Sequence, residues 1–185
     1  MNQEQIQILI DRCVQNDQKA FAVLVAEYQT MVFRLSFRLL CDEDEARDMV
    51  QETFTKVWIS LDKYNRACRF STWIYKIASN TCYDRLRAMQ HSPAGYRTEM
   101  DTSCLNITSD DNVEQNLSNR DLQALIFRFT EELTPKQKLV FTLRDVEGLD
   151  VSEVEVITGM SAEKIKSNLY QARKQIRIKI NQIDK

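Results

Sequence analysis

Glycine and proline are scarce in this sequence, which holds three glycines and two prolines in 185 residues. A sheet protein needs turn residues at short intervals, so this scarcity argues against one. Residues that favour helices, such as Glu, Gln, Leu, Lys and Arg, are abundant instead. No run of about 18 apolar residues occurs either, which by that criterion excludes a transmembrane helix. We therefore expect a helical protein with no membrane insertion.

Clustered ligands for a metal ion are also lacking. The sequence has a single histidine, His91, and five scattered cysteines without a CxxC pair. Zinc sites draw on clustered Cys and His, so we expect no metal site. Small apolar filler in a reducing compartment is the simpler role for the cysteines, and one reactive thiol is the alternative. The first residues, MNQEQIQILIDRC, lack the basic stretch and apolar core of a signal peptide, so we expect a cytoplasmic protein.

The net charge of −2 is low for a free-standing nucleic-acid binder, which is expected to be basic. However, the charges are segregated along the chain. Residues 42–52 hold six acids against one arginine, and residues 98–116 hold five acids and no base. Residues 161–180 hold six Lys or Arg against Glu163 alone. Such blocks indicate separate surfaces for separate partners.

Apolar residues recur at helical spacing through the first 90 residues. We expect a short helix over 3–15 and a longer one that Asp17 caps. The longer helix places one apolar face inward, made of Phe21, Leu24, Tyr28, Val32, Leu35 and Leu39. Asp42 and Glu45 read as a capping box for the next helix, and Ser71 as the cap of a helix from Thr72 to about Ala88.

Residues 90–118 interrupt this periodicity. They contain Pro93, Gly95, several Ser, Thr and Asn residues and the acidic excess. A loop of that length is unusual inside a compact domain, so we interpret it as a linker. The predicted fold class is all-α, with two small helical domains, 1–90 and 119–185, joined by an acidic flexible linker over 91–118.

The C-terminal part carries clear signals for helix starts and stops. Pro135 suits the first position of a helix, and Gly148 and Gly159 suit the positions just after two helices. The caps that we expect are Thr134 with Gln137, Ser152 with Glu155, and Ser161. A short helix, a glycine-bearing turn and a basic helix are typical of a helix-turn-helix.

The last predicted helix suits DNA binding. In a helix-turn-helix the N-terminal part of the second helix meets base edges, and cations further along bind phosphates. A merely solvated basic face is the alternative. The candidate DNA contacts are Lys164, Lys166, Ser167, Tyr170, Gln171, Arg173 and Lys174.

Two segments of the first domain carry further candidates. In one, aromatic residues alternate with cations and an amide, which suits single-stranded nucleic acid because bases stack on rings and phosphates meet cations. Its members are Phe70, Ser71, Thr72, Trp73, Lys76, Asn80 and Arg85. The other is an acidic helix face with Asp48, Gln51 and Glu52. The alternatives are that Trp73 belongs to the core and that the acidic face is only solvated.

Three stretches together resemble a known family. EARDMVQETFTKVW (45–58) and SLDKYNRACRFSTWIYKIASNTCYDRLR (60–87) look like the core-binding and promoter-melting segments of extracytoplasmic-function (ECF) sigma factors. LTPKQKLVFTLRDVEGLDVSEVEVITGMSAEKIKSNLYQARKQI (133–176) resembles their second domain. The resemblance covers well over half of the chain, in the family's order and spacing.

This resemblance implies an alternative, signal-responsive transcription initiation factor and not an enzyme. Such a factor binds core RNA polymerase, directs it to specific promoter DNA and helps to open the duplex. The implied partners are core RNA polymerase, promoter DNA and an anti-sigma protein, with no cofactor and no small-molecule substrate.

The resemblance also implies roles for the candidates. Asp48, Gln51 and Glu52 would contact the clamp helices of polymerase. Phe70 to Trp73 would open the duplex, and Asn80 would read an extruded base of the minus-ten element. The last helix, with Lys166, Ser167 and Arg173, would enter the minus-thirty-five element. Departures from the family at Glu155, Asn168 and 161–163 concern the details of minus-thirty-five recognition.

Two other classes stay open. A dimeric repressor would explain only the helix-turn-helix and would bind DNA tightly without polymerase. An enzyme would need convergent acid, base, nucleophile or metal groups, for which the sequence offers little. Co-purification with core polymerase distinguishes a sigma factor from a repressor.

Overall fold

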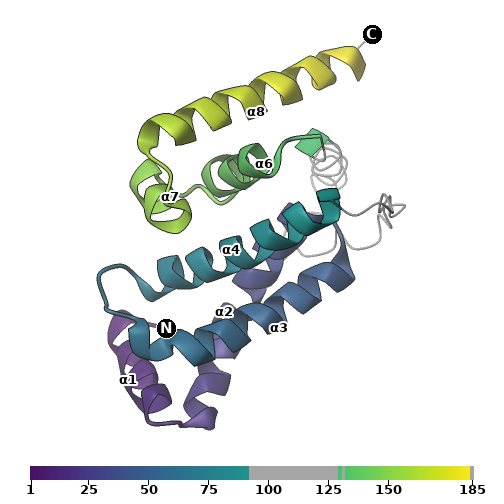
Figure 1. The fold of residues 1–185 in the computed structure, drawn as a ribbon. Coiled ribbons are helices and arrows are strands. Elements are labelled where there is room, and N and C mark those ends of the chain that lie inside the picture. The colour runs from purple at the N-terminus through teal and green to yellow at the C-terminus, as the bar shows by residue number, and fades with distance from the viewer. Residues whose placement is uncertain (92–128, 131, 184–185) are drawn as a thin grey trace, which may run out of the picture.

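The computed structural model describes residues 1–91, 129–130 and 132–183. All the regular structure within these ranges is helical (Figure 1), which confirms the predicted fold class. The linker predicted over 91–118 lies outside the described residues, apart from His91.

The N-terminal helices form one domain around α2. The elements are α1 (Gln3–Val14), α2 (Gln18–Leu40), α3 (Glu43–Ser60), the 3-10 turn η1 (Leu61–Lys63) and α4 (Phe70–His91). α2 packs against α1, α3 and α4, and its Leu24, Val32, Leu35 and Leu39 are buried. α2 is also long and apolar enough to cross a membrane by length and composition alone. Its apolar face supplies the core of this domain, so we assign it to the core.

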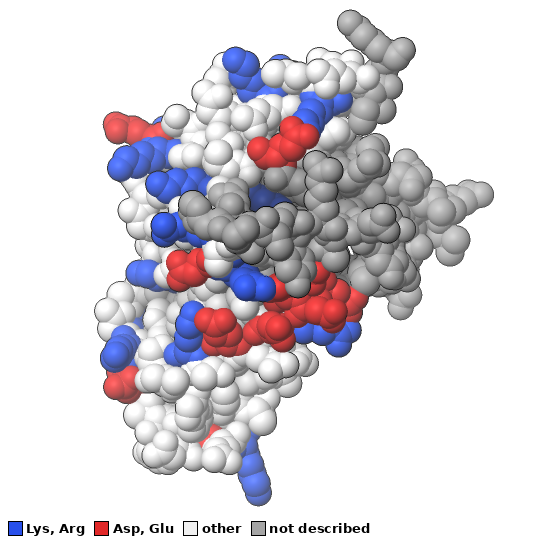
Figure 2. Space-filling model, turned by 45° about the vertical axis from the view of Figure 1, so that its right-hand side comes forward, with Lys and Arg blue, Asp and Glu red and all other residues white. Residues whose placement is uncertain are grey.

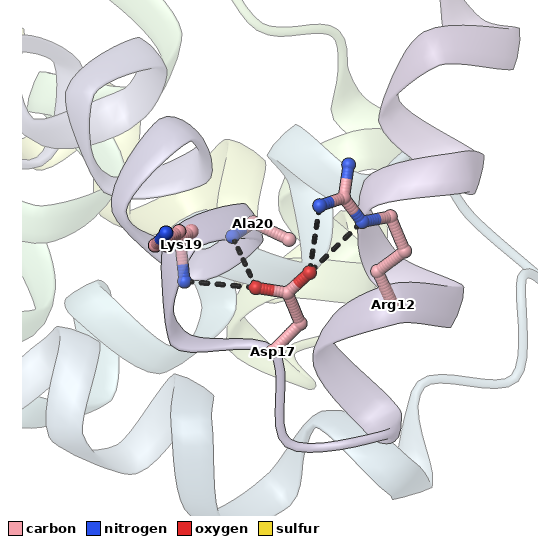
Figure 3. Close-up of polar contacts among 4 residues, drawn as sticks. All are labelled: Arg12, Asp17, Lys19 and Ala20. Carbon is pink, nitrogen blue, oxygen red and sulfur yellow. Dashed lines mark hydrogen bonds and ion pairs between the residues drawn. The ribbon is translucent and has the colours of Figure 1, made fainter.

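Asp17 caps α2 as the sequence predicts (Figure 3). Its carboxylate accepts hydrogen bonds from the backbone N–H groups of Lys19 at 3.0 Å and Ala20 at 3.1 Å. The guanidinium of Arg12 donates two further bonds to the same carboxylate, at 2.9 and 2.7 Å. The bond from Ala20 and those from Arg12 lower the pKa of Asp17. A single side chain therefore both starts α2 and ties it to the end of α1.

In this domain the structure corrects one predicted capping box and one predicted helix start. Asp42 does cap α3, accepting from the backbone N–H of Glu45 at 2.9 Å. The carboxylate of Glu45 does not complete the box, because it pairs with Arg85 of α4 instead. α4 begins at Phe70, before the Ser71 cap that the sequence predicts. Burial explains the earlier start, since the Phe70 ring is only 2% exposed and core packing holds it in the first turn.

The C-terminal elements form a second helical domain. They are α6 (Pro135–Phe141), the π-helical turn η3 (Thr142–Val146), α7 (Val151–Thr158) and α8 (Ala162–Ile183). α8 packs against α6 and α7. Its buried face consists of Ile165, Leu169, Ala172 and Ile176.

Several of the predicted boundaries in this domain are confirmed. Thr134 and Gln137 form the expected capping box ahead of Pro135. Gly148 and Gly159 adopt positive φ angles of 71° and 69°, which a residue with a Cβ rarely adopts. Gly159 directly follows α7, as predicted.

Other boundaries in this domain differ from the prediction. The helix expected to run to Gly148 changes at Thr142 into the π turn, where the N–H of Glu147 bonds the carbonyl of Thr142 at 2.9 Å. The box ahead of α7 consists of Asp150 and Glu153 and not of Ser152 and Glu155. Spacing alone could not separate these two overlapping boxes.

The two domains pack against each other in this structure. Figure 1 shows α4 lying between the other N-terminal helices and the pair α6 and α7. The contacts join α4 to α6 and α7, and α2 to η3. The exposed faces of α3 and α8 are left on different sides of this contact.

Candidate nucleic-acid and partner interfaces

The acidic candidates lie on the outer face of α3. Asp48, Gln51 and Glu52 are all exposed, as predicted. Glu52 pairs with Lys56 one turn later at 2.7 Å. The Lys56 Nζ also donates to the hydroxyl of Thr81 on α4 at 3.1 Å. Glu52 is therefore placed by a chain of contacts that links α3 to α4.

The surface charge is unevenly distributed (Figure 2). In this view acidic side chains gather in a band at about the height of α3. Basic side chains are spread over this face from the upper part, where α6, α7 and α8 lie, to the lower end. The acids therefore form a cluster on this face, whereas the bases do not form a single patch.

The aromatic candidates of α4 belong largely to the core. Phe70 packs edge-on against Tyr28 and Tyr64, with ring centroids 5.5 and 5.2 Å apart. Trp73 is half-buried and stacks on Phe70 at 5.7 Å. Thr72 is 6% exposed. Phe70 therefore does not precede the helix, as the predicted start at Thr72 would have it, because its buried ring anchors the first turn of α4.

The surface that α4 does expose contains Lys76 and Asn80, while Ser71 is half-buried. Asn80 follows Trp73 by seven residues, two helical turns, so both lie on one face. Arg85 differs from Lys76 because the Glu45 carboxylate of α3 holds its guanidinium through two nitrogens. Arg85 therefore ties α4 to α3 in this structure.

α8 presents most of its candidates to solvent. Its apolar residues face α6 and α7, which turns the remaining positions outward. The exposed candidates are Lys164, Lys166, Ser167, Tyr170, Gln171, Arg173 and Lys174. Tyr170 is the most open of the large side chains among them, at 65%.

Arg173 differs from the other candidate cations of α8 because it is already paired. Its guanidinium donates to both oxygens of Asp145 in η3, at 2.7 and 2.6 Å. These bonds raise the pKa of Arg173 above its ordinary value. Within the described residues, Lys164, Lys166 and Lys174 have no ion pair. The predicted site thus contains free lysines beside one internally neutralised arginine.

Glu155 holds the start of α8. Its carboxylate accepts from the backbone N–H of Ala162 at 2.7 Å. An N–H of the first helical turn has no partner inside the helix, so this bond fixes the angle between α7 and α8. The charged side chain of Glu155 therefore caps the first turn of α8.

Comparison with known proteins decides between the open classes. Residues 24–91 match the family model "Sigma-70 region 2", and residues 123–176 match "Sigma-70, region 4". The chain is 31% identical over 179 residues to ECF RNA polymerase sigma-E factor of Escherichia coli K12, covering 94% of this chain and 93% of the relative. The chain belongs to the ECF sigma factors. The family and the function inferred from the sequence, an alternative sigma factor for transcription initiation, are confirmed.

Other relatives and solved structures agree with this family. The RNA polymerase sigma-H factor of Pseudomonas aeruginosa is 28% identical over 184 residues, or 95% of this chain and 94% of the relative. The fold matches CnrH in complex with the cytosolic domain of CnrY at a TM-score of 0.67, with 20% identity over 96% of this chain and 97% of that one. It also matches the sigma factor RpoE of Bartonella quintana, in complex with the anti-sigma factor NepR, at 0.64, with 21% identity over 90% and 99%.

A polar cluster of Tyr75, Arg38 and Glu147 joins the region 2 and region 4 helices, and it was not predicted from the sequence. The hydroxyl of Tyr75 on α4 donates to a carboxylate oxygen of Glu147 at 2.8 Å, and Arg38 of α2 pairs with the same carboxylate. Burial, and then the nearby Glu147 charge, raise the pKa of Tyr75 well above its ordinary value. The partners are 72 and 109 residues apart in sequence, so no local pattern could have indicated them.

The cysteines of this ECF sigma factor fit the role of apolar filler where they are buried. Cys13 and Cys82 are each 3% exposed or less, and burial raises the pKa of both thiols to about 11. Such thiols are almost fully protonated at neutral pH and are poor nucleophiles. Cys104 lies outside the described residues.

Proposed function

We propose that this chain is a non-enzymatic factor that binds core RNA polymerase and promoter DNA through separate domains. In this proposal residues 1–90 bind core polymerase, melt the promoter and read the minus-ten element. Residues 119–185 read the minus-thirty-five element. The observation that carries the proposal is the separation of exposed acids on α3 from exposed bases on α8, in a chain whose two halves match sigma-70 regions 2 and 4.

Core polymerase is the proposed partner of the α3 face. Asp48, Gln51 and Glu52 supply charge and hydrogen bonding on a helix whose other side is anchored in the domain core. A protein partner with complementary cations would be steered to this face and set in register by it. Its acidic character makes direct contact with DNA phosphates unfavourable.

Promoter opening is proposed to use the exposed face of α4. Asn80 offers an amide that can bond the edge of an extruded base, and Lys76 offers a cation for the backbone of the unpaired strand. Trp73 lies on the same face, and Ser71, half-buried in the first turn of α4, is proposed to contact DNA at the end of the helix. Phe70 and Thr72 act beneath it by holding the first turn of α4 in place.

Minus-thirty-five recognition is proposed for α8. Its N-terminal half would place Ser167, Tyr170 and Gln171 at base edges in the major groove, while Lys164, Lys166 and Lys174 meet phosphates. Because the chain as a whole is slightly acidic, much of the DNA affinity has to come from polymerase.

An anti-sigma protein and a cytoplasmic location complete the proposal. Of two proteins with the same fold, the sigma factor RpoE has been solved in complex with the anti-sigma factor NepR, and CnrH in complex with the cytosolic domain of CnrY. By likeness, we expect an anti-sigma protein to control this factor in the cytoplasm, where polymerase and promoters are found.

The test begins with association between the purified chain and core RNA polymerase. A sigma factor binds core polymerase and gives promoter-specific initiation. A repressor would bind duplex DNA tightly by itself and leave polymerase unbound, and that result would overturn the proposal.

Asn80→Ala then tests the melting face. The variant should impair open-complex formation on duplex promoters and leave core binding unchanged, because extruding a base costs a few kcal/mol that its pocket must offset. A template already unpaired in the minus-ten region should restore part of the loss. Permanganate reactivity of unpaired thymines reports opening. Gln29→Ala, an exposed amide on α2, is the matched control. Normal opening by Asn80→Ala would remove Asn80 from the site.

A further inference from the structure

The contact between the two domains is centred on one carboxylate. Glu147 directly follows η3 in region 4, and its side chain is 12% exposed. It accepts from the Tyr75 hydroxyl at 2.8 Å and pairs with the Arg38 guanidinium. Both of these side-chain partners belong to region 2.

Burial makes these bonds matter for the arrangement of the domains. A carboxylate removed from water is costly unless it is paired and hydrogen-bonded. Neither domain supplies the whole cluster, so each would return its part to water if the domains separated. The cluster is therefore satisfied only while region 4 lies on region 2. Its geometry specifies this arrangement more closely than apolar packing would.

A second polar contact crosses the same boundary. Lys138 of α6 is only 5% exposed. Its Nζ lies 3.3 Å from the Sγ of Cys41, which follows the last residue of α2. A lysine side chain is rarely buried to this degree, and here its head group contacts the neighbouring domain. Two independent polar contacts thus occur in one interface.

We infer that Glu147 is a latch that holds the free factor in a closed form, with region 4 docked on α4 and the end of α2. The inference rests on the proposed function, because closure matters only if the two domains read separate promoter elements. Use of both promoter elements at once then requires the latch to open, and Glu147 regulates how readily the polymerase-bound factor engages a promoter.

The spacing of the promoter elements explains why the closed form cannot act. The minus-ten and minus-thirty-five elements lie about 25 base pairs apart, which is about 85 Å at a rise of ~3.4 Å per pair. In the closed form only α6 and α7 lie between α4 and α8. Two helix packing distances of 8–10 Å amount to about 20 Å. The reading faces of α4 and α8 therefore cannot occupy both elements at once.

A closed form lowers the apparent affinity of the polymerase-bound factor for a promoter that carries both elements. When only a fraction of the molecules is open, the apparent dissociation constant rises in inverse proportion to that fraction. Weakening the latch should therefore tighten promoter binding by the holoenzyme. A residue that itself contacted the promoter would give the opposite result when it is changed.

The experiment compares the wild type with Glu147→Gln and Tyr75→Phe in the full chain. Both variants keep the side-chain shape and remove the charge or the hydroxyl. Holoenzyme formed with each variant should bind a promoter fragment that carries both elements on the order of tenfold more tightly, since a hydrogen bond to a charged group is lost from the closed form only. The double variant should gain little beyond either single one. Small-angle X-ray scattering of the free proteins should show a larger radius of gyration for the variants.

Asp11→Asn is the control, because it removes an exposed ion pair with Arg66 inside the N-terminal domain. It should change neither the affinity nor the radius. Unchanged affinity and radius in Glu147→Gln and Tyr75→Phe, with wild-type folding by circular dichroism, would overturn the latch. If the wild type itself did not bind core polymerase, the proposed function would fail, and scattering alone would still decide whether Glu147 keeps the chain closed.

Discussion

Lys166 and Arg173 of α8 allow a direct test of which cations meet DNA. Both were predicted from the sequence as contacts to the minus-thirty-five element. In the structure Lys166 is exposed and has no ion pair within the described residues. The guanidinium of Arg173, by contrast, donates two hydrogen bonds to Asp145. The pair of Arg173 and Asp145 carries no net charge, so it attracts few counterions and few phosphates.

The salt dependence of DNA binding measures this difference. Each phosphate that a cation neutralises adds about 0.9 to the slope of log affinity against log salt. Lys166→Ala should therefore flatten the slope by about 0.9, while Arg173→Ala should leave it almost unchanged. Asp145→Asn removes the competing charge and should steepen the slope by up to about 0.9. Between 50 and 200 mM salt, one such contact changes the affinity ratio by about 3.5-fold.

The assay is the affinity of reconstituted holoenzyme for a promoter fragment at four or five salt concentrations. Polymerase contributes the same background in every variant, so differences between slopes report α8 alone. Lys174→Ala should behave like Lys166→Ala, because its side chain is also exposed. If Arg173→Ala flattened the slope as much as Lys166→Ala, the pair with Asp145 would open on DNA and the reasoning would be refuted.

Two further predictions concern region 2. Glu52→Lys should weaken association with core polymerase by a few kcal/mol in a competition assay, because it reverses a contact charge and repels Lys56. The control Glu4→Lys changes an exposed acid on α1 and should leave the affinity for core polymerase unchanged. If Glu52→Lys bound core polymerase as tightly as the wild type, Glu52 would not belong to the interface. Asp17→Ala should lower the melting temperature by a few degrees, whereas Asp17→Asn should keep most of the cap. Since the pKa of Asp17 is lowered in the folded state, its contribution is present above the ordinary carboxyl pKa and is lost as pH falls through the lowered value. The melting temperatures of the wild type and Asp17→Ala should therefore converge on acidification, and a constant difference would contradict the assignment.

Local patterns account for the features that the sequence predicts well. The inward face of α2, the Asp17 cap and the capping box at Thr134 each depend on residues within a few positions of one another. Helical periodicity and capping are properties of the chain itself, so they can be read without knowing the tertiary fold. The family followed from longer runs, in which several such features occur in a fixed order.

Tertiary contacts account for what the sequence did not predict. Phe70 enters the helix because its ring packs on Tyr28 and Tyr64, although Ser71 is the better cap by residue type. The Glu45 side chain does not bond back to the backbone of Asp42, because it pairs with Arg85, which lies 40 residues later in the chain. In both cases a local preference is overridden by a partner that folding alone brings near.

The candidate contacts also divide by residue type, and the division has a physical cause. Both arginines in the predicted sites, Arg85 and Arg173, are held by a carboxylate through two nitrogens. The planar guanidinium matches a carboxylate in this way, whereas a lysine ammonium is a strongly hydrated point charge that stays in water. Lys76, Lys166 and Lys174 are accordingly exposed. A basic helix in a sequence thus overstates the free positive charge wherever arginine has an acid within reach. The α8 surface that remains is a set of lysines, which favours modest, salt-sensitive DNA binding that depends on polymerase for the rest.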